Sequence, residues 1–428
     1  MLTRTDGRFD CLDDWLEWQQ TLHPRKIDLG LERVKRVFAA LHPGYLPPIT
    51  ITVGGTNGKG SCIALLEAIL CAQGISTGCY TSPHILRYNE RIRIAGQPQP
   101  DEAICEAFAR IDAVRGEASL SFFEFGTLAA LDLFSRAQVE VQLLEVGLGG
   151  RLDAVNIIDA DVAIITSIDI DHKEWLGEDR ETIGAEKAGI FRSHRPAVIG
   201  DRVPPRSLLE RARKLGVRLS RIGRDFDCQL HEAGWDWCSE DDVLRNLPYP
   251  ALPGRQQFDN AATVIAAMRM LEARLDVSES ALRQGLEGVR LPGRYQKIPA
   301  QPEILLDVAH NPQAAGFLAD YVKTTYPGRR IKALFTVMAD KDLEGIVARM
   351  KDVVDVWALA PLPANPRTAT EPRLLEAFKA VGLTSPLHGF DGWKQALQAL
   401  MQDTEGHDLI LVFGSFFLIA EFLADHGH

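Results

Sequence analysis

A glycine-rich stretch near the start of the chain combines the residue types that bind phosphate. The stretch "TVGGTNGKGS", Thr52 to Ser61, follows a run of β-branched residues that predicts a strand. Backbone N–H groups in such a turn attract anions, and so does the start of the helix that follows. Lys59 can bridge phosphate oxygens, and Ser61 can lie near a metal ion. The stretch therefore predicts a phosphate-binding loop; the alternative is a strand–helix turn that binds nothing.

The spacing of this loop differs from the usual Walker A pattern, G-x-x-x-x-G-K-[ST]. Counting back from Lys59, Val53 occupies the position of the first glycine, and Gly60 separates Lys59 from the hydroxyl of Ser61. A generic P-loop kinase or GTPase would keep the standard spacing. The loop therefore indicates a nucleotide site of another kind.

Acidic residues follow two further predicted strands. "LLEVGLGGRLDAVN" places Glu145 near the end of one, and "TSIDIDHKEWLG" places Asp169, Asp171 and His172 at the end of the next. Ligands of open α/β sheets bind beyond the carboxyl ends of strands, and Mg²⁺ is held by few protein ligands plus waters and phosphates. Glu145 is thus either a magnesium ligand or a cap for the loop glycines. Lys187, in "GAEKAGIF", taken alone is an ordinary helix lysine.

The segment "YTSPHILRYNERIRI" carries local positive charge in an acidic chain. Pro83 ends regular structure and leaves Ser82 and His84 on a turn. Three arginines follow within seven residues, and composition alone favours a solvated basic face: Arg87, Arg91 and Arg93.

The last third of the chain repeats the strand-end arrangement. "LLDVAHNP" ends a predicted strand with Asp307, His310 and Asn311, and "LVFGSFF" places Ser415 at another strand end. Asp307 could receive a ribose hydroxyl, and His310 could contact phosphate or substrate. Turn chemistry is the alternative for each of them.

Composition excludes several classes of protein. The 428 residues are 46% hydrophobic and 25% charged with a net charge of -11, and no run of basic residues indicates nucleic-acid binding. Seven scattered cysteines suggest reduced thiols rather than disulfides or a zinc site. The first residues contain no apolar signal core, and the apolar run 409–420 is too short to span a bilayer. We expect a cytoplasmic protein with no membrane contact and, since nothing demands more, a monomer.

Short apolar runs alternate with amphipathic stretches along the whole chain. This pattern predicts an α/β fold with a doubly wound, mostly parallel sheet in a P-loop-containing domain. A proline- and glycine-rich segment, 288–303, reads as a linker, and a smaller Rossmann-like α/β domain follows it. The predicted domains are 1–295, which contains the phosphate loop, and 296–428.

Eight motifs in this order resemble those of the bacterial bifunctional dihydrofolate synthase/folylpolyglutamate synthase family, relatives of the Mur ligases. The motifs are "GGTNGKGS", "TSPH", "FFEFGTLAALDLF", "EVGLGGRLDAVN", "TSIDIDHKEWLG", "EKAGIFR", "LPGRYQ" and "DVAHNP". The resemblance runs from about Trp15 to Ser415. It implies an ATP-dependent ligase that adds L-glutamate to dihydropteroate and to tetrahydrofolate through an acyl phosphate.

The resemblance also assigns residues to roles, position by position. It implies ATP contacts at Thr56, Asn57, Gly58, Lys59, Gly60, Ser61, Asn260, Arg294, Asp307 and His310. It implies magnesium ligands, for two ions, at Ser61, Ser82, Glu145 and His172. It implies catalytic roles for Lys59, His172 and Lys187, the last as a carbamylated lysine that supports a metal. It implies substrate contacts at Asp28, Leu29, Gly30, Leu31, Ser121, Phe122, Phe123, Glu124, Leu152, Asp153, Ala154 and Ser415.

Three other interpretations compete with this one. A Mur-type ligase of peptidoglycan precursors would share several motifs, but only 53 residues precede Gly54, too few for the N-terminal domain that most of those ligases carry. A folylpolyglutamate synthase without the dihydrofolate synthase activity stays open. A non-catalytic nucleotide sensor would have no need for Glu145, His172 and Lys187 together.

Overall fold

The computed structural model describes residues 8–23 and 28–427, which form two compact units. The first unit comprises Met1–Ile170, Trp175–Ala251 and Phe258–Val289, as far as these are described. The second comprises Asp171–Glu174, Leu252–Gln257 and Arg290–His428, again as far as described.

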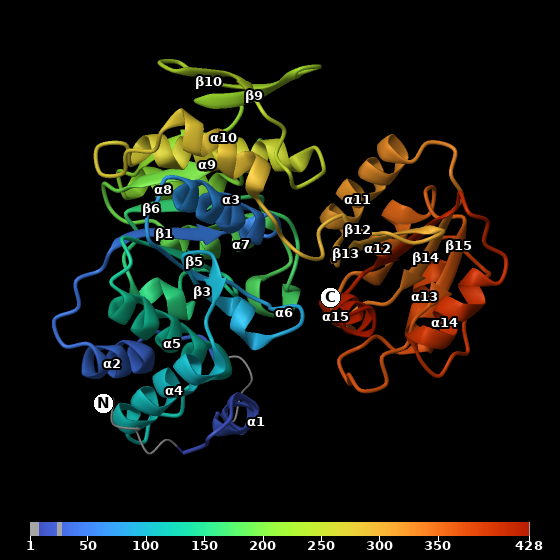
Figure 1. Cartoon of the computed structure of the whole chain (residues 1–428), viewed down its shortest axis with the longest axis horizontal. Helices are drawn as coiled ribbons and strands as arrows, with labels where there is room; N and C mark the ends of the chain where they lie inside the picture. Colours follow the sequence, from blue (N-terminus) through green and yellow to red (C-terminus); the bar gives the residue numbers. More distant parts are fainter. Residues whose placement is uncertain (1–7, 24–27, 428) are drawn as a thin grey trace. The chain divides into compact units, whose positions relative to one another are not determined.

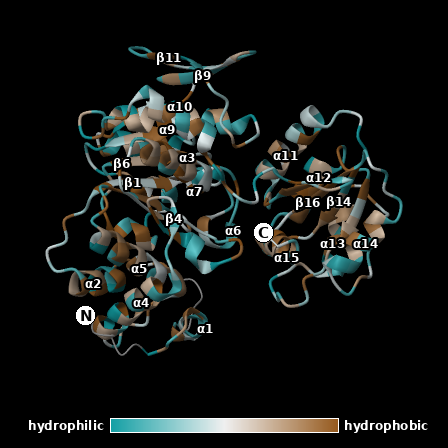
Figure 2. Cartoon of the chain, viewed as in Figure 1, coloured by the Kyte–Doolittle hydropathy of each residue, from teal (hydrophilic) through white to brown (hydrophobic). Residues whose placement is uncertain are grey.

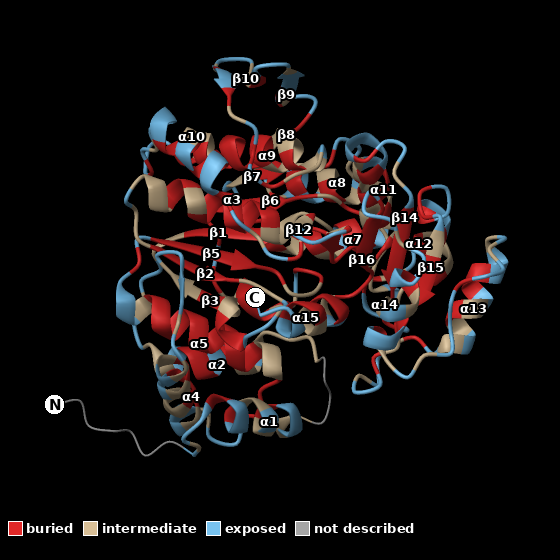
Figure 3. Ribbon diagram, turned by 45° about the vertical axis from the view of Figure 1, so that its right-hand side comes forward, coloured by how far each residue is buried: buried red, intermediate tan, exposed pale blue. Residues whose placement is uncertain are grey.

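The first unit is built on an eight-stranded sheet with the order β4-β3-β2-β5-β1-β6-β7-β8. The strands are β1 (Ile49–Gly54), β2 (Thr77–Tyr80), β3 (Ile92–Ile94), β4 (Gln97–Pro98), β5 (Val141–Glu145), β6 (Val162–Ile165), β7 (Pro196–Ile199) and β8 (Arg218–Arg221). Neighbours from β2 through β8 pair in parallel, whereas β3 and β4 are antiparallel additions at one edge. In β1 the residues on both faces are buried, as expected for a parallel strand covered on both sides (Figure 3).

Helices cover both faces of this sheet (Figure 1). One side carries α3 (Lys59–Ala72), α9 (Gln256–Met270) and α10 (Glu279–Gly288). The other carries α2 (Glu32–Leu41), α4 (Asp101–Arg115) and α5 (Phe122–Ala137), with α1 (Leu12–Leu22) packed on α4 and α5. The remaining helices of the chain up to residue 251 are η1 (Tyr88–Arg91), η2 (Ala154–Ile157), α6 (Lys173–Leu176), α7 (Arg180–Lys187), η3 (Ala188–Ile190) and α8 (Arg206–Lys214).

A small antiparallel sheet, β11-β10-β9, lies outside these layers, beyond α9 and α10 (Figure 1). Its strands are β9 (Phe226–His231), β10 (Gly234–Ser239) and β11 (Val243–Leu247). The sheet is anchored by Trp235 and Trp237, which are buried and donate from their indole N–H groups to Pro248 O and Ala262 O.

The second unit has a five-stranded sheet with the order β12-β13-β16-β14-β15. Its strands are β12 (Gln296–Ile298), β13 (Glu303–Asp307), β14 (Ile331–Phe335), β15 (Val356–Leu359) and β16 (Leu409–Phe413). Its helices are α11 (Pro312–Thr325), α12 (Leu343–Met350), α13 (Glu371–Ala380), α14 (Trp393–Met401) and α15 (Phe416–Asp425). In Figure 2 the strands β14 and β16 are brown, and their side chains form a core with α11, α12 and α13.

The predicted fold class is confirmed, because each unit is an α/β layer structure with a mostly parallel sheet. The interpretation of 288–303 as a linker is partly wrong. Within that segment β12 pairs antiparallel with β13, so the proline- and glycine-rich sequence contains an edge strand. No helix among the described residues is long and apolar enough to cross a membrane.

Candidate active site

The predicted phosphate loop, 55–58, joins β1 to α3 and has a backbone shape that only glycine allows at two positions. Gly55 has a φ of 143°, and a Cβ there would lie 1.8 Å from Thr166 Oγ1. Gly58 has a φ of 92°, and its Cβ would lie 2.7 Å from Oδ1 of Asn260 on α9. Side chains are therefore excluded by conformation and by space. This cradle lets backbone N–H groups approach an anion closely at the start of α3.

The end of β6 fixes the loop without any ligand. Thr56 N donates to Ser167 O at 2.6 Å, and Thr166 Oγ1 donates to Asn57 O at 2.6 Å. The hydroxyl of Thr56 donates to Asp169 O and accepts from Asp169 N, both at 3.0 Å. Since β1 and β6 are neighbouring strands, the loop is held at the carboxyl edge of the sheet.

Two lysines reach the same carbonyl of this loop. Lys59 Nζ donates to Gly55 O at 3.1 Å and to Thr56 O at 3.2 Å. Lys187, the last residue of α7, is 5% exposed and donates from Nζ to Gly55 O at 2.9 Å. The interpretation of Lys187 as an ordinary solvated helix lysine is thus wrong. Two positive charges therefore lie beside the phosphate loop, which favours anion binding there.

Glu145 and Ser82 meet beside the loop. Glu145 is the last residue of β5, paired in register with Val53 of β1, and its Oε2 accepts from Ser82 N at 3.1 Å. Burial raises the pKa of the Cys62 thiol, and the charge of Glu145 adds to this effect. The Glu145 carboxylate therefore lies close enough to the first turn of α3 for its charge to raise the pKa of Cys62. Ser61, in the same turn, is also buried.

These groups fit a magnesium–nucleotide complex better than a metal held by protein alone. Among the described residues, no group of three or more His, Cys, Asp or Glu side chains could hold a metal ion. Mg²⁺ commonly takes one or two carboxylates and completes its octahedron with waters and phosphates. Glu145, Ser82 and Ser61 next to a phosphate loop match that pattern. His172 falls in the second unit, where its N–H donates to Asp171 Oδ1 at 2.8 Å, and its place in the metal site stays a prediction.

An arginine that sequence reasoning missed connects two of the predicted substrate segments. Arg33 Nε donates to both carboxylate oxygens of Glu124, at 2.8 and 2.9 Å. Its Nη2 donates to Asp28 O at 2.6 Å, and its Nη1 donates to the Asp28 carboxylate. Glu124 also closes a capping box with Ser121 at the start of α5. Arg33 lies among other charged residues of α2, so its spacing gives no signal that singles it out.

Phe123 is enclosed by small and aromatic neighbours. Its ring centroid lies 5.6 Å from that of Tyr80, and a Cβ on Gly147 would approach its Cζ to 2.6 Å. The glycine is therefore required for the ring to occupy this place. Such a ring can stack on a flat heterocycle.

Asp153 is buried and is the N-cap of η2. Its carboxylate accepts from Leu148 N at 2.8 Å and from Val155 N at 3.0 Å. Burial raises its pKa to about 6, although these hydrogen bonds and the charge of Lys187 lower it. A carboxyl with such a pKa can accept from or donate to a pterin ring, but it also serves the turn.

The other predicted substrate residues lie on the same elements. Leu31 precedes α2, and Ala154 begins η2. The remaining positions of the set are Leu29, Gly30, Phe122 and Leu152. The resemblance also matches the whole segment "KIDLGLERV", 26–34, to a pterin-binding segment; its first two residues lie outside the described residues, and these roles stay predictions.

In the second unit, the strand ends form a comparable edge. Asp307 ends β13, opposite Phe413 of β16, and accepts from Tyr295 N at 3.0 Å and Ala309 N at 2.8 Å. Burial raises the pKa of Asp307, and the neighbouring Arg294 lowers it. Its carboxylate is thus fixed by backbone donors at the place expected for a ribose contact.

His310 and Ser415 lie at this edge too. His310 Nδ1 donates to Val308 O at 2.8 Å, and burial lowers the pKa of the imidazole to about 4, so it is neutral at pH 7. Its ring lies 5.6 Å from Phe416, over which the guanidinium of Arg294 sits at 5.7 Å. Ser415 caps α15, its Oγ accepting from the N–H two residues on at 3.1 Å. Asp307, His310 and Ser415 therefore lie at the same edge of the sheet. The hydrogen bond that Ser415 accepts is that of a helix cap, which matches the alternative of turn chemistry.

Asp171 belongs to the second unit and pairs with a lysine that sequence reasoning also missed. Lys341 Nζ lies 2.7 Å from Asp171 Oδ1, and Asn311 Nδ2 donates to Oδ2 at 3.3 Å. Burial raises the pKa of Asp171, but the charges of His172 and Lys341 outweigh it and hold the pKa well below the usual range. Asp171 is therefore ionised and forms an ion pair with Lys341 in which both side chains are buried.

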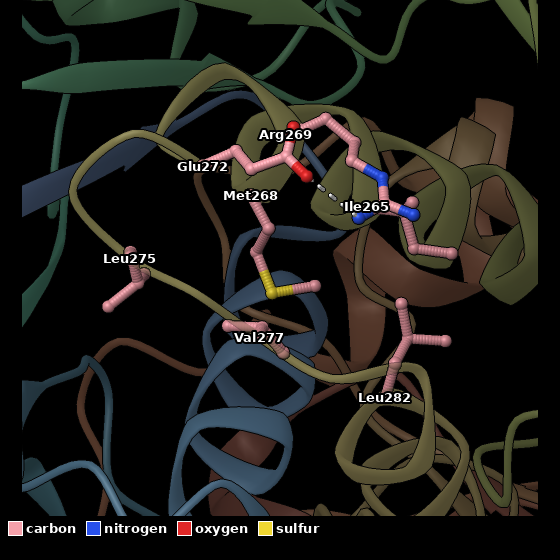
Figure 4. Close-up of a pocket in the computed structure, with 7 residues that line it drawn as sticks. All are labelled: Ile265, Met268, Arg269, Glu272, Leu275, Val277 and Leu282. Carbon is pink, nitrogen blue, oxygen red and sulfur yellow. Dashed lines mark ion pairs between the residues drawn. The ribbon is translucent and has the colours of Figure 1, made fainter. Parts of the chain in front are cut away.

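A pocket elsewhere in the first unit does not coincide with any of these residues (Figure 4). It lies where α9 ends and α10 begins, with one ion pair between Arg269 and Glu272. Its lining residues are Ile265, Met268, Arg269, Glu272, Leu275, Val277 and Leu282.

Comparison with known proteins places the chain in a family. Residues 53–268 match the Mur ligase middle domain, and residues 293–416 match the Mur ligase glutamate ligase domain. The chain is 44% identical over 420 residues to the dihydrofolate synthase/folylpolyglutamate synthase of Escherichia coli K12, covering 98% of this chain and 96% of that protein.

Solved structures agree with the sequence comparison. Escherichia coli FolC in complex with DHPP and ADP superposes with a TM-score of 0.92 at 44% identity, covering 99% of each chain. A bifunctional folylpolyglutamate synthase/dihydrofolate synthase with Mn, AMPPNP and L-glutamate bound gives a TM-score of 0.91 at 42% identity, covering 99% of this chain and 100% of that one.

The fold and the matched domains define a Mur ligase, a class of ATP-dependent ligases. Within that class, the chain belongs to the dihydrofolate synthase/folylpolyglutamate synthase family.

Proposed function

We propose that this chain is an ATP-dependent carboxylate–amine ligase. It joins L-glutamate to dihydropteroate, making dihydrofolate, and to tetrahydrofolate, making folylpolyglutamates. The observation that supports this most strongly is the convergence of Lys59 and Lys187 on Gly55 O in the phosphate loop. A nucleotide-binding loop in a member of this family is the part that couples ATP cleavage to amide formation.

The reaction has two bond-forming steps. A carboxylate oxygen of the pterin substrate attacks the γ-phosphorus of ATP, giving an acyl phosphate and ADP. The amino nitrogen of L-glutamate then attacks the acyl carbon, phosphate leaves, and the nitrogen loses a proton to water. The reactants are all anionic, so the loop N–H groups and Lys59 stabilise the charge on the transferred phosphoryl group. Positioning of three substrates supplies much of the remaining acceleration.

We assign the metal ligands as the family resemblance implies. Ser61, Ser82, Glu145 and His172 would hold magnesium, as two ions, which neutralises phosphate charge when bound. We also propose that Lys187 is carbamylated in the active enzyme. Its burial beside Gly55 O supports a role at the loop, and a carbamate would add a metal-supporting anion there.

The remaining substrates are assigned to the segments described above. The pterin would bind between the Asp28–Leu31 and Ser121–Glu124 segments and the turn at Asp153, with Phe123 stacking on it. The adenosine would meet Asn260, Arg294 and Asp307, and the incoming glutamate would lie near His310 and Ser415. The bound DHPP, ADP and L-glutamate of the related structures support these substrate classes.

We further propose two functional domains, 1–295 with the ATP and pterin sites and 296–428 with the glutamate-ligase part. The protein would act as a monomer in the cytoplasm, with no nucleic acid or membrane partner. Gel filtration with light scattering would test the oligomeric state.

The decisive assay measures phosphate release from ATP by the purified protein. We expect release only when L-glutamate and either dihydropteroate or tetrahydrofolate are both present. Offering the two pterins separately tests bifunctionality. Turnover with tetrahydrofolate and not with dihydropteroate would show that the chain is a folylpolyglutamate synthase only. A 32% identical relative from Lacticaseibacillus casei carries that name. Turnover with a UDP-muramyl peptide and not with folates would refute the proposal.

Carbamylation has its own test. Protein equilibrated with ¹³C-bicarbonate should show a carbamate carbonyl signal by NMR that is lost in the Lys187→Ala variant. An active wild-type enzyme without this signal would remove the carbamate from the account.

A further inference from the structure

The segment between β2 and β3 is organised around one carboxylate. Glu90 Oε1 accepts from Leu86 N at 2.8 Å and from Arg87 N at 2.7 Å, and its Oε2 accepts from Ile85 N at 2.7 Å. Three consecutive backbone N–H groups thus converge on one side chain. A carboxylate that accepts several N–H donors is a strong local constraint, because charge-assisted hydrogen bonds are about twice as strong as neutral ones. The segment that begins at Ser82 is held in one shape by Glu90.

A largely buried arginine, Arg93, connects this segment to the helix that follows the phosphate loop. Arg93 Nε donates to Glu67 Oε2 at 2.9 Å, and its Nη2 lies 2.7 Å from the same oxygen. Its Nη1 donates to Glu90 O at 2.9 Å and to Thr81 Oγ1 at 3.2 Å. Both charged side chains of the ion pair are largely buried, at 18% and 11% exposure. The planar guanidinium therefore joins α3 to the residue before Ser82.

The two ends of this connection are the two sides of the proposed metal site. Glu67 lies on α3, whose first turn follows the phosphate loop and carries Ser61. Ser82 follows Thr81 directly, and its N–H donates to Glu145. Displacement of the 81–90 segment relative to α3 would therefore move Ser82 away from the phosphate loop and break its hydrogen bond to the Glu145 carboxylate.

A purely stabilising role does not account well for this arrangement. Burying an ion pair costs about as much desolvation free energy as its attraction returns, so a Glu67–Arg93 pair alone is weak evidence for stability. Fixing one geometry of two elements is what a bidentate arginine does best.

We propose that Glu90 and Arg93 are positioning residues that keep Ser82 and Glu145 in register with the phosphate loop, so that metal affinity depends on them. This inference rests on the proposed function of the same site. The two groups act on the metal site through Ser82 and Glu145.

The test measures metal binding directly. Full-length protein with the non-hydrolysable ATP analogue AMPPNP is titrated with Mn²⁺, and free Mn²⁺ is followed by electron paramagnetic resonance. In Glu90→Gln the carboxamide NH₂ can no longer accept a backbone N–H. We expect the Kd of Mn²⁺ to rise about tenfold or more, the usual effect of altering groups behind metal ligands.

Glu117→Gln is the matched control, because this exposed carboxylate lies outside the segment. It should bind Mn²⁺ like the wild type. The Tm of Glu90→Gln should stay within about 3 °C of the wild type, which corresponds to roughly 1 kcal/mol or less. Phosphate release by Glu90→Gln should recover as Mg²⁺ is raised, with the KM for L-glutamate unchanged.

An unchanged Kd for Mn²⁺ in folded Glu90→Gln would overturn the proposal, and so would lost turnover that excess Mg²⁺ does not restore. If Glu90→Gln fails to fold, Arg93→Lys takes its place with the same outcomes, since lysine keeps the charge and loses the fork. Wild-type protein that binds Mn²⁺ with AMPPNP but does not turn over folates would refute the proposed function and leave the positioning role standing.

Discussion

Two buried lysines, one in each unit, differ in what they contact. Lys187 is 5% exposed and donates to Gly55 O in the phosphate loop. Lys332, on β14, is 1% exposed and donates to Leu400 O at 3.2 Å and Thr404 Oγ1 at 2.8 Å. The acceptors of Lys332 lie where α14 ends, and its ammonium shares the Leu400 carbonyl with the hydroxyl of Thr404.

The comparison teaches that burial of a charge does not by itself indicate function. Both lysines are less exposed than lysine usually is, and both have hydrogen-bond partners. Lys332 contacts the end of a helix, whereas Lys187 contacts a glycine-rich loop at a strand end where an anion fits. Matched substitutions of the two lysines test this difference between a functional and a structural role.

The largest effect is expected for Lys187→Met, which keeps the volume and removes the charge. Turnover should fall by about 10²–10³-fold, the usual cost of removing a positioned electrostatic group. The free energy of unfolding, from urea titration, should change far less than the barrier does. Full turnover in this variant would remove Lys187 from the active site.

The same substitution at Lys332 should act on stability alone. Lys332→Met removes the ammonium that donates to Leu400 O and Thr404 Oγ1 and that faces the buried Asp408 carboxylate, and we expect a loss of about 2–4 kcal/mol in the free energy of unfolding. Activity per folded molecule at low temperature should be unchanged. Lys351→Met, at an exposed position, is the control and should change neither quantity. A large fall in kcat with unchanged stability would give Lys332 a functional role.

The raised pKa of Asp153 should make the free energy of unfolding depend on pH. Its pKa is raised from 3.8 to about 6 by burial, so between these pH values the folded state holds a proton that the unfolded state has released. The free energy of unfolding of the wild type should therefore fall by about 2–3 kcal/mol as pH rises from about 4 to 6. Asp153→Asn, which has no carboxyl at this position, should not show this fall. Urea unfolding of both proteins at pH 4.5 and 7.5 measures this difference. Parallel stability changes in the two proteins would contradict the raised pKa.

The smallest effect concerns a buried polar group without a partner. Gln19 on α1 is 1% exposed, and neither atom of its amide has a hydrogen-bond partner among the described residues. Unlike the two lysines, this amide should destabilise the folded state. Gln19→Leu should therefore raise the free energy of unfolding by about 1–2 kcal/mol at unchanged activity. The exposed neighbour provides the control, Gln20→Leu, which should change stability little. A destabilised Gln19→Leu would indicate a partner for this amide.

The sequence predicted those features that are local. The phosphate loop could be located because its strand, glycines and helix are consecutive, and the strand ends at Glu145, Asp307 and Ser415 followed from apolar runs. Resemblance to a family, not spacing, singled out Lys187.

What sequence reasoning missed depends on long-range contacts. Arg33 and Lys341 each bind a carboxylate supplied by another element, and no pattern along the chain indicates such a partner. The prediction of a solvated basic face is wrong for Arg93, because its side chain is largely buried and pairs with Glu67 of α3. The strand β12 escaped notice because it is only three residues long and is identified by its pairing with β13. The β9–β11 sheet was missed because half-polar antiparallel strands give a weak signal next to buried parallel ones.

The most direct test of the account follows the oxygen atoms of the reaction. The pterin substrate is labelled with ¹⁸O in its carboxylate and incubated with ATP, L-glutamate and the enzyme, and the released phosphate is analysed by mass spectrometry. Activation of the carboxylate as an acyl phosphate predicts that one ¹⁸O atom moves into the phosphate as the amide forms. Amide product accompanied by unlabelled phosphate would contradict the central claim that this loop couples ATP to carboxylate activation.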